Sequence, residues 1–126
     1  MSQIKSAMAT AQEVQAFLDQ FRLCVEFGAT VNFRQTAKNI QGLATLNMTQ
    51  TQAAERVCAL RPTRYCKGPE PDRDQDGKEI WVFGCEENEV EVYVKLRLDT
   101  GKPFSRPVIR SFHPAEHPMS YPFKGG

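Results

Sequence analysis

Residues 90–98 alternate apolar and polar side chains without interruption, in the order VEVYVKLRL. Successive side chains of a β-strand point to opposite faces of its sheet, so this period of two predicts a strand with one buried face. The valines and leucines would enter a core, and the other face would carry towards solvent Tyr93, Lys95 and Arg97. Because a sheet with one apolar face needs a second layer to cover it, this segment constrains the fold strongly.

Two capping boxes mark helices in the N-terminal half of the chain, which could supply that layer. Thr10 is followed by Glu13, and Thr49 by Gln52, so each pair can satisfy free N–H groups at a helix start. The first of these helices is expected to end at Gly28, and the other is expected to end before the next proline.

A further helix is predicted over residues 34–45, with Ile40 on its buried side beside two leucines. The segment 67–77 is rich in glycine, proline and aspartate and is predicted to be a loop. Besides residues 90–98, strands are predicted at 29–33, 80–85 and 107–113. The expected fold is therefore α+β, with N-terminal helices packed on one face of a small antiparallel β-sheet.

The 126 residues are expected to form a single domain, because a chain of this size can bury one core. Its expected parts are a loose N-terminus at 1–9, a mainly helical half at 10–61, a β-meander at 79–113 and a proline-rich tail at 114–126. No segment reaches the roughly 20 apolar residues of a membrane span. The first residues also lack the apolar run of a signal peptide, so the expected location is the cytoplasm.

The net charge of +1 does not indicate nucleic-acid binding, so the local distribution of cations matters more. The polar face of residues 90–98 would present a phenol and two cations. If residues 107–113 pair beside it, either Arg110 or the set Ile109, Ser111 and His113 joins that face, and both registers remain open. Such a face suits an RNA phosphodiester, because cations can bind the phosphate while other groups transfer protons at the 2′-hydroxyl and the 5′-oxygen.

Two histidines, a lysine and the tryptophan are further candidates for function. His113 could act as an acid or a base, because imidazole groups titrate near neutrality. His113 and His117 have the spacing of a metal pair, but the prolines between and after them oppose the helix that such a pair needs. Lys67 lies in the predicted loop, where functional residues often gather. Trp81 is expected either to pack in the core or to stack on an unpaired base.

Four short blocks stand in order along the second half of the chain. They read YCKGP at 65–69, IWVFG at 80–84, VYVKL at 92–96 and SFH at 111–113. The last block opens the tail SFHPAEHPMSYPF at 111–123. Over residues 12–123 these blocks and the layout of the helical half resemble a divergent branch of the MqsR family of type II toxin–antitoxin toxins.

The resemblance implies a RelE-like, microbial-ribonuclease-like fold and a bacterial mRNA interferase, an endoribonuclease that cleaves mRNA without a metal or other cofactor. It also implies an antitoxin partner, often with a helix-turn-helix DNA-binding domain. Carried over by position, it implies catalytic roles for Lys67 and Tyr93, and for His113, which stands where the family has a lysine. Val82 stands where the family has a glutamine. The residues expected to bind RNA are Lys95, Arg97, Arg110 and Trp81.

A second hypothesis is a non-catalytic module on the same fold that binds protein or RNA. Val82 in place of a polar side chain favours this alternative, and so does the low net charge. The two hypotheses differ in whether purified protein cleaves RNA.

Overall fold

The computed structural model describes residues 8–75, 77–101 and 105–125, and within them a threonine precedes each α-helix. Each threonine side chain accepts a hydrogen bond from a backbone N–H of the first helical turn, which the helix itself leaves without a partner. The capping boxes at Thr10 and Thr49 are both present, as predicted. The helices are α1 (Ala11–Glu26), α2 (Ala37–Leu46), α3 (Gln50–Cys58) and the short 3₁₀-helix η1 (Pro62–Arg64).

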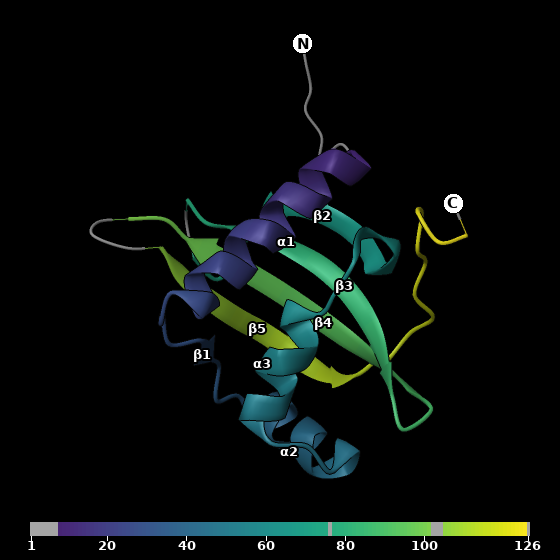
Figure 1. The fold of residues 1–126 in the computed structure, drawn as a ribbon. Coiled ribbons are helices and arrows are strands. Elements are labelled where there is room, and N and C mark those ends of the chain that lie inside the picture. Colours follow the sequence, from purple (N-terminus) through teal and green to yellow (C-terminus); the bar gives the residue numbers. More distant parts are fainter. Residues whose placement is uncertain (1–7, 76, 102–104, 126) are drawn as a thin grey trace.

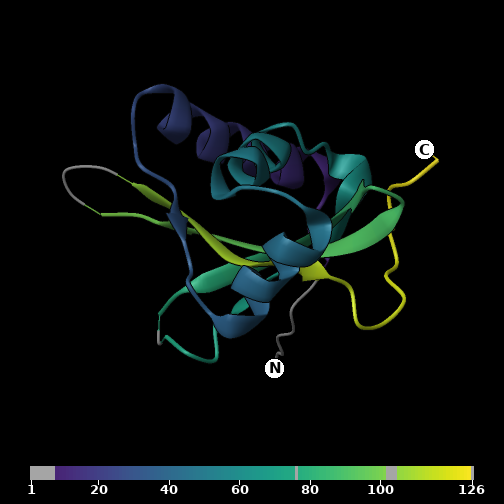
Figure 2. The ribbon, with the colours of Figure 1, turned by 90° about the horizontal axis from the view of Figure 1, so that it is seen from below.

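Five strands form one sheet in the order β1-β5-β4-β3-β2. The strands are β1 (Asn32–Phe33), β2 (Tyr65–Pro71), β3 (Glu79–Glu87), β4 (Val90–Asp99) and β5 (Arg106–Pro114). Neighbours from β5 to β2 are antiparallel, and only β1 pairs in parallel with β5. In Figures 1 and 2, α1 and α3 lie over one face of this sheet, and α2 packs beside β5. The predicted α+β fold is confirmed.

The core lies between α1, α3 and the apolar face of the sheet. Val92, Val94 and Leu96 of β4 are fully buried there, as the alternation predicts. From α1 the core receives Val14, Phe17, Leu18 and Phe21, and α3 adds Ala53 and Val57. No helix in the described part of the chain combines the length and apolarity needed to cross a membrane.

Three predictions about the helical half were wrong in detail. The helix predicted over 34–45 begins only at Ala37, because the Thr36 side chain caps it. Ile40 is 44% exposed, whereas Asn39 is buried. Asn39 occupies the inward position because its side-chain amide forms hydrogen bonds with the backbone of β5 at the edge of the sheet. The strand predicted over 29–33 is also shorter, since only Asn32–Phe33 pairs with β5.

Residues 67–71 belong to β2, although they were predicted to be part of a loop. β2 is an edge strand, and its register shifts on both sides of Lys67. An irregular edge strand tolerates proline, because N–H groups on its outer side bond to no neighbouring strand. The turn between β2 and β3 begins at Asp72, whose backbone N–H donates to the Lys78 carbonyl oxygen at 2.9 Å.

The predicted loose N-terminus is too long by at least one residue. Ala9 is buried in the core, and its N–H donates to the Tyr65 hydroxyl at 3.1 Å. Residues 1–7 of that prediction lie outside the described part of the chain.

A register shift in β5 determines which side chains reach the second face, the face of the sheet opposite α1 and α3. Lys95 of β4 is opposite Ser111, whereas Leu96 is opposite Ile109, so Arg110 is an extra residue in β5. The Arg110 side chain then extends on the same face as Ser111, and Ile109 enters the core. Of the alternatives that the sequence left open, Arg110 and two members of the other set, Ser111 and His113, share the second face, whereas Ile109 does not.

Candidate active site

Two rows of side chains cross the second face. Residues directly opposite each other in an antiparallel pair share a face, so the registers define these rows. One row contains Lys67 of β2, Val82 of β3, Lys95 of β4 and Ser111 of β5. The adjacent row contains Gly84 of β3, Tyr93 of β4 and His113 of β5. Residues far apart in sequence therefore become neighbours.

All residues of these rows except Gly84 line a pocket of about 570 Å³. The pocket brings together the three residues predicted to be catalytic, Lys67, Tyr93 and His113, with the predicted RNA-binding residue Lys95. Its remaining lining comes from Cys66 of β2, from α2, which contributes Lys38, and from the tail at 116–120. The pocket is therefore shared by strands, a helix and the C-terminal segment.

His113 is buried and is held in one orientation. Its ring stacks on Tyr93, with 5.5 Å between the ring centroids and 30° between the planes. Nδ1 lies 2.9 Å from the Pro114 carbonyl oxygen, which can only accept a hydrogen bond. Nδ1 therefore carries a proton, and Nε2 is the proton acceptor of the neutral ring. Gly42 of α2 approaches so closely that a Cβ there would lie 2.7 Å from the His113 Cβ.

Burial controls the protonation of the two β4 groups in the pocket. It raises the pKa of the Tyr93 phenol, and the nearby Glu70 carboxylate raises it further. The phenol is therefore protonated at neutral pH and can donate a proton. Burial also lowers the pKa of Lys95, and the Arg110 guanidinium lowers it further. The Lys95 Nζ lies 5.6 Å from the Tyr93 ring centroid.

The two lysines of the first row differ in their surroundings. Lys67 is exposed, and its Nζ lies 3.6 Å from Glu70 Oε2. Lys95 forms no ion pair with any residue that the structure describes. Lys95 is thus a half-buried cation that an anionic ligand could pair with.

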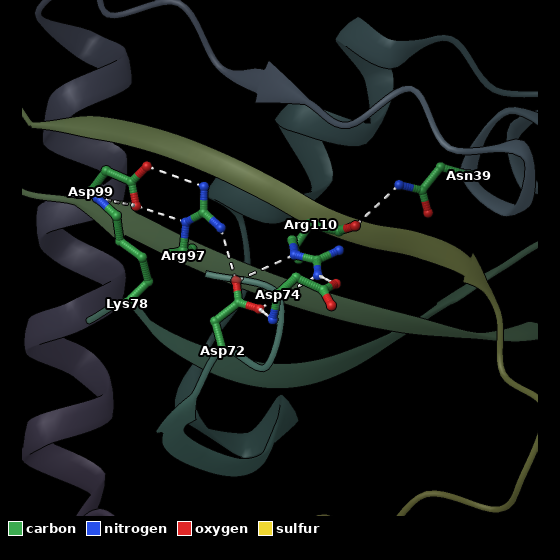
Figure 3. A network of polar contacts seen from close by, with 7 residues as sticks. All are labelled: Asn39, Asp72, Asp74, Lys78, Arg97, Asp99 and Arg110. Carbon is green, nitrogen blue, oxygen red and sulfur yellow. Dashed lines mark hydrogen bonds and ion pairs between the residues drawn. The ribbon is translucent and has the colours of Figure 1, made fainter. Parts of the chain in front are cut away.

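Arg97 and Arg110 do not face solvent as predicted, because both bind the Asp72 carboxylate (Figure 3). Arg97 Nη1 lies 2.8 Å from Asp72 Oδ2, and the side chain of Arg97 is only 4% exposed. Its Nε donates at 2.7 Å to Asp99, and Arg110 pairs in addition with Asp74. A buried charge is stable only when it is paired, so these carboxylates keep both guanidinium groups from an RNA phosphate.

The turn between β2 and β3 contains Asp72, whose buried carboxylate is ionised. Asp72 is 6% exposed, which disfavours ionisation, but hydrogen bonds from the Asp74 N–H, Arg110 and Arg97 lower its pKa to about 2. The turn between β2 and β3 is thereby fastened to β4 and β5. The arginines shape the second face and do not enlarge its cationic surface.

Trp81 lies on the other side of the sheet from the pocket. Its ring stacks on Phe17 of α1, with 4.6 Å between the centroids and 13° between the planes. It also contacts Tyr65 edge-on. Of its two predicted roles, packing against the core is the one that its position supports.

Several residues that shape the pocket were not predicted. Asn39 holds the edge of β5, Gly84 provides space under the tail, and residues 118–120 line the pocket. Glycine in the middle of a strand is a usable signal for close approach of another chain segment. The position of the tail has no local signal, because a proline-rich segment without periodicity shows only that it is irregular.

Fold and site together define a small α+β domain with a pocket that contains a tyrosine, two histidines and three lysines. The chain matches no protein-family model, no curated protein and no solved structure. Its function must therefore be inferred from the chemistry of the pocket and from the sequence blocks that resemble the MqsR family.

Proposed function

We propose that this protein is the toxin of a bacterial toxin–antitoxin pair and cleaves mRNA in this pocket without a metal ion. One observation carries the proposal: a phenol, two imidazoles and three lysine ammonium groups line a single pocket. The one carboxylate in the lining, Glu116, is paired with Lys38 at 3.0 Å. A pocket with an excess of cations attracts the phosphates of RNA.

The proposed reaction begins at the ribose 2′-hydroxyl. Nε2 of neutral His113 accepts its proton while the 2′-oxygen forms a bond to phosphorus. The bond from phosphorus to the 5′-oxygen breaks, and Tyr93 donates a proton to that oxygen. The products are a 2′,3′-cyclic phosphate and a 5′-hydroxyl, and a proton passes from His113 to the Tyr93 phenolate to restore both groups. No water or other reactant is consumed.

Lys67 and Lys95 would bind the non-bridging phosphate oxygens. They lie in one row of the sheet on either side of Val82, so both can approach a ligand above that row. Their positive charge stabilises the negative charge that builds on these oxygens in the transition state. Arg97 and Arg110 hold the turn at Asp72 and have no direct role in this proposal.

The RelE-like fold and the antitoxin partner are parts of the proposal that rest on the resemblance of the sequence blocks. The cytoplasm is the location expected of a protein that cleaves mRNA. The expected antitoxin carries a helix-turn-helix DNA-binding domain and is encoded next to this protein. Co-expression of the neighbouring open reading frame should relieve growth arrest caused by this protein. Failure to relieve it would contradict the pairing and leave the cleavage reaction to a separate test.

The decisive experiment incubates a defined mRNA with purified protein, with and without EDTA, and separates the products on a gel. We expect discrete fragments in both conditions, with cyclic phosphate ends. His113→Ala, purified in the same way, should lose cleavage, and this excludes a contaminating ribonuclease. Arg73→Ala removes an exposed cation outside the pocket and should cleave normally. Intact mRNA with wild-type protein would overturn the enzymatic proposal.

A second candidate function is RNA binding without cleavage. It is favoured by Val82, an apolar group between the two phosphate-binding lysines, and by the pairing of Lys67 with Glu70. In that case the same gel shows intact RNA, and the complex dissociates steeply as salt increases.

A further inference from the structure

Four consecutive tail residues form a separate part of the pocket lining, which we call the pocket wall. The pocket wall consists of His117, Pro118, Met119 and Ser120. None of the four takes part in the proposed proton transfers or in phosphate binding. They belong to no helix or strand, so something other than secondary structure must hold them in place.

The N-terminal end of the pocket wall is fixed by two contacts. The Ala115 N–H donates to the Glu91 carbonyl oxygen of β4 at 2.8 Å. Glu116 forms an ion pair with Lys38 of α2, at 3.0 Å between Nζ and Oε2. The tail is thus attached to the sheet and to a helix just before the wall begins.

Tyr121 fixes the C-terminal end of the pocket wall. Its hydroxyl donates to Glu91 Oε2 at 2.8 Å and accepts from Arg64 Nη2 at 3.2 Å. The Arg64 guanidinium also lies 4.3 Å from the centroid of the Tyr121 ring. The ring rests on Gly84, where a Cβ would overlap the Tyr121 hydroxyl. A segment of four residues between two such anchors is preorganised, and preorganisation favours selective binding.

The two sides of the pocket differ in charge. The strand side carries Lys67 and Lys95, whereas the pocket wall contains one titratable group, His117. A proline ring and a methionine thioether provide apolar surface, an imidazole can stack, and the Ser120 hydroxyl can donate or accept a hydrogen bond. A nucleotide has the same division, with a charged phosphate on one side and an uncharged, flat base on the other.

We infer that the pocket wall binds the unpaired nucleobase next to the scissile phosphate and so selects the sequence that is cleaved. This inference rests on the proposed function and extends it. Protein side chains commonly recognise single-stranded RNA by stacking on splayed bases and by hydrogen bonds to their edges. The wall offers both kinds of contact within one pocket that also holds the phosphate-binding lysines.

The test measures binding of short fluorescent RNA oligonucleotides that contain the mapped cleavage site. A 2′-deoxy substitution at that site removes the attacking hydroxyl and prevents cleavage. Abasic versions lack the base on one side of the phosphate or on the other. With wild-type protein, one abasic position should weaken binding roughly tenfold, as expected for the loss of one stacked base. With the double variant His117→Ala and Met119→Ala, removal of the same base should change affinity less than about twofold.

Met8→Ala is the matched control, because Met8 is an exposed methionine outside this pocket. This variant should keep the full effect of the missing base. An equal abasic effect in wild type and in the double variant would overturn the inference, and so would the absence of any abasic effect. Neither result touches cleavage itself, which is measured separately on the all-ribose oligonucleotide. Circular dichroism of the double variant excludes unfolding as a cause.

Discussion

The Asn39 side chain of α2 holds the backbone of β5 at Arg110: its Nδ2 donates to the Arg110 carbonyl oxygen at 3.1 Å (Figure 3). Its Oδ1 accepts from the Phe112 N–H at 3.0 Å. Among the described strands β1 alone borders this edge of β5, and it ends at Phe33. Asn39 therefore supplies the partners that a longer β1 would have supplied, at the point where β5 contains its extra residue.

Asn39→Ala should lower the free energy of unfolding by about 3 kcal/mol, because two buried backbone groups lose their partners. Urea denaturation followed by circular dichroism measures this change. The control is Gln41→Ala on the exposed side of the same helix, which should change stability by less than about 0.5 kcal/mol. Equal effects of the two substitutions would contradict the role of Asn39.

Asp72 should make the protein less stable in acid. Its pKa of about 2 in the folded state lies below its ordinary value, so the ionised form stabilises the fold at neutral pH. This contribution, about 2 kcal/mol, is complete above the ordinary pKa and is lost as the pH falls through the folded pKa, between about pH 5 and pH 2. Urea denaturation at a series of pH values measures the loss.

Asp72→Asn isolates this contribution from that of the other carboxylates. It should cost about 3 kcal/mol at neutral pH, because Arg97 and Arg110 lose a charged partner. The difference in stability between wild type and variant should shrink as the pH falls. Asp74→Asn is the control, since the Asp74 side chain is 72% exposed. A difference that stays constant with pH would refute the assignment.

Gly84→Ala should release the tail from the sheet. The added methyl group would overlap the Tyr121 hydroxyl, and that anchor of residues 117–120 would be lost. Hydrogen–deuterium exchange of the peptide 115–125 should become faster, while exchange in β4 stays slow. Gly101→Ala is the matched control, because a Cβ at Gly101 meets no atom within 4 Å. Unchanged exchange in the Gly84 variant would contradict the anchoring role of Tyr121.

Tyr93→Phe should lower the single-turnover rate of RNA cleavage by about 100-fold, the usual size of a proton-transfer contribution. The phenyl ring keeps the stacking contact with His113, so RNA affinity should change little. Kinetics at saturating protein separate the rate from the affinity. A normal rate would remove Tyr93 from the mechanism but would leave the assignment of His113 open to its own test.

Much of the secondary structure was predictable, because the signals are local. The capping boxes at Thr10 and Thr49 place the starts of α1 and α3 correctly. The main error was β2, where proline and glycine indicated a loop. Those residues pair because β3 offers an adjacent edge, and that information is not contained in residues 67–71 themselves.

The candidate site was predictable in part. Tyr93 and Lys95 share a face in the structure as the alternation predicted, and Lys67 and His113 join them in the pocket. Arg97 has the predicted facing but is buried, because Asp72 lies against it. A partner that is 25 residues away in sequence cannot be recognised from the strand alone.

The period of two in residues 90–98 alone determined which of its side chains share a face, because backbone geometry sets that alternation within each strand. Only the tertiary structure decided which neighbours those side chains meet. The register of β5 depends on an extra residue at Arg110 and on Asn39, which lies 71 residues earlier in the chain. The far side of the pocket depends on Tyr121 and Gly84. Such pairings result from packing between distant segments, and no local pattern in either segment specifies them.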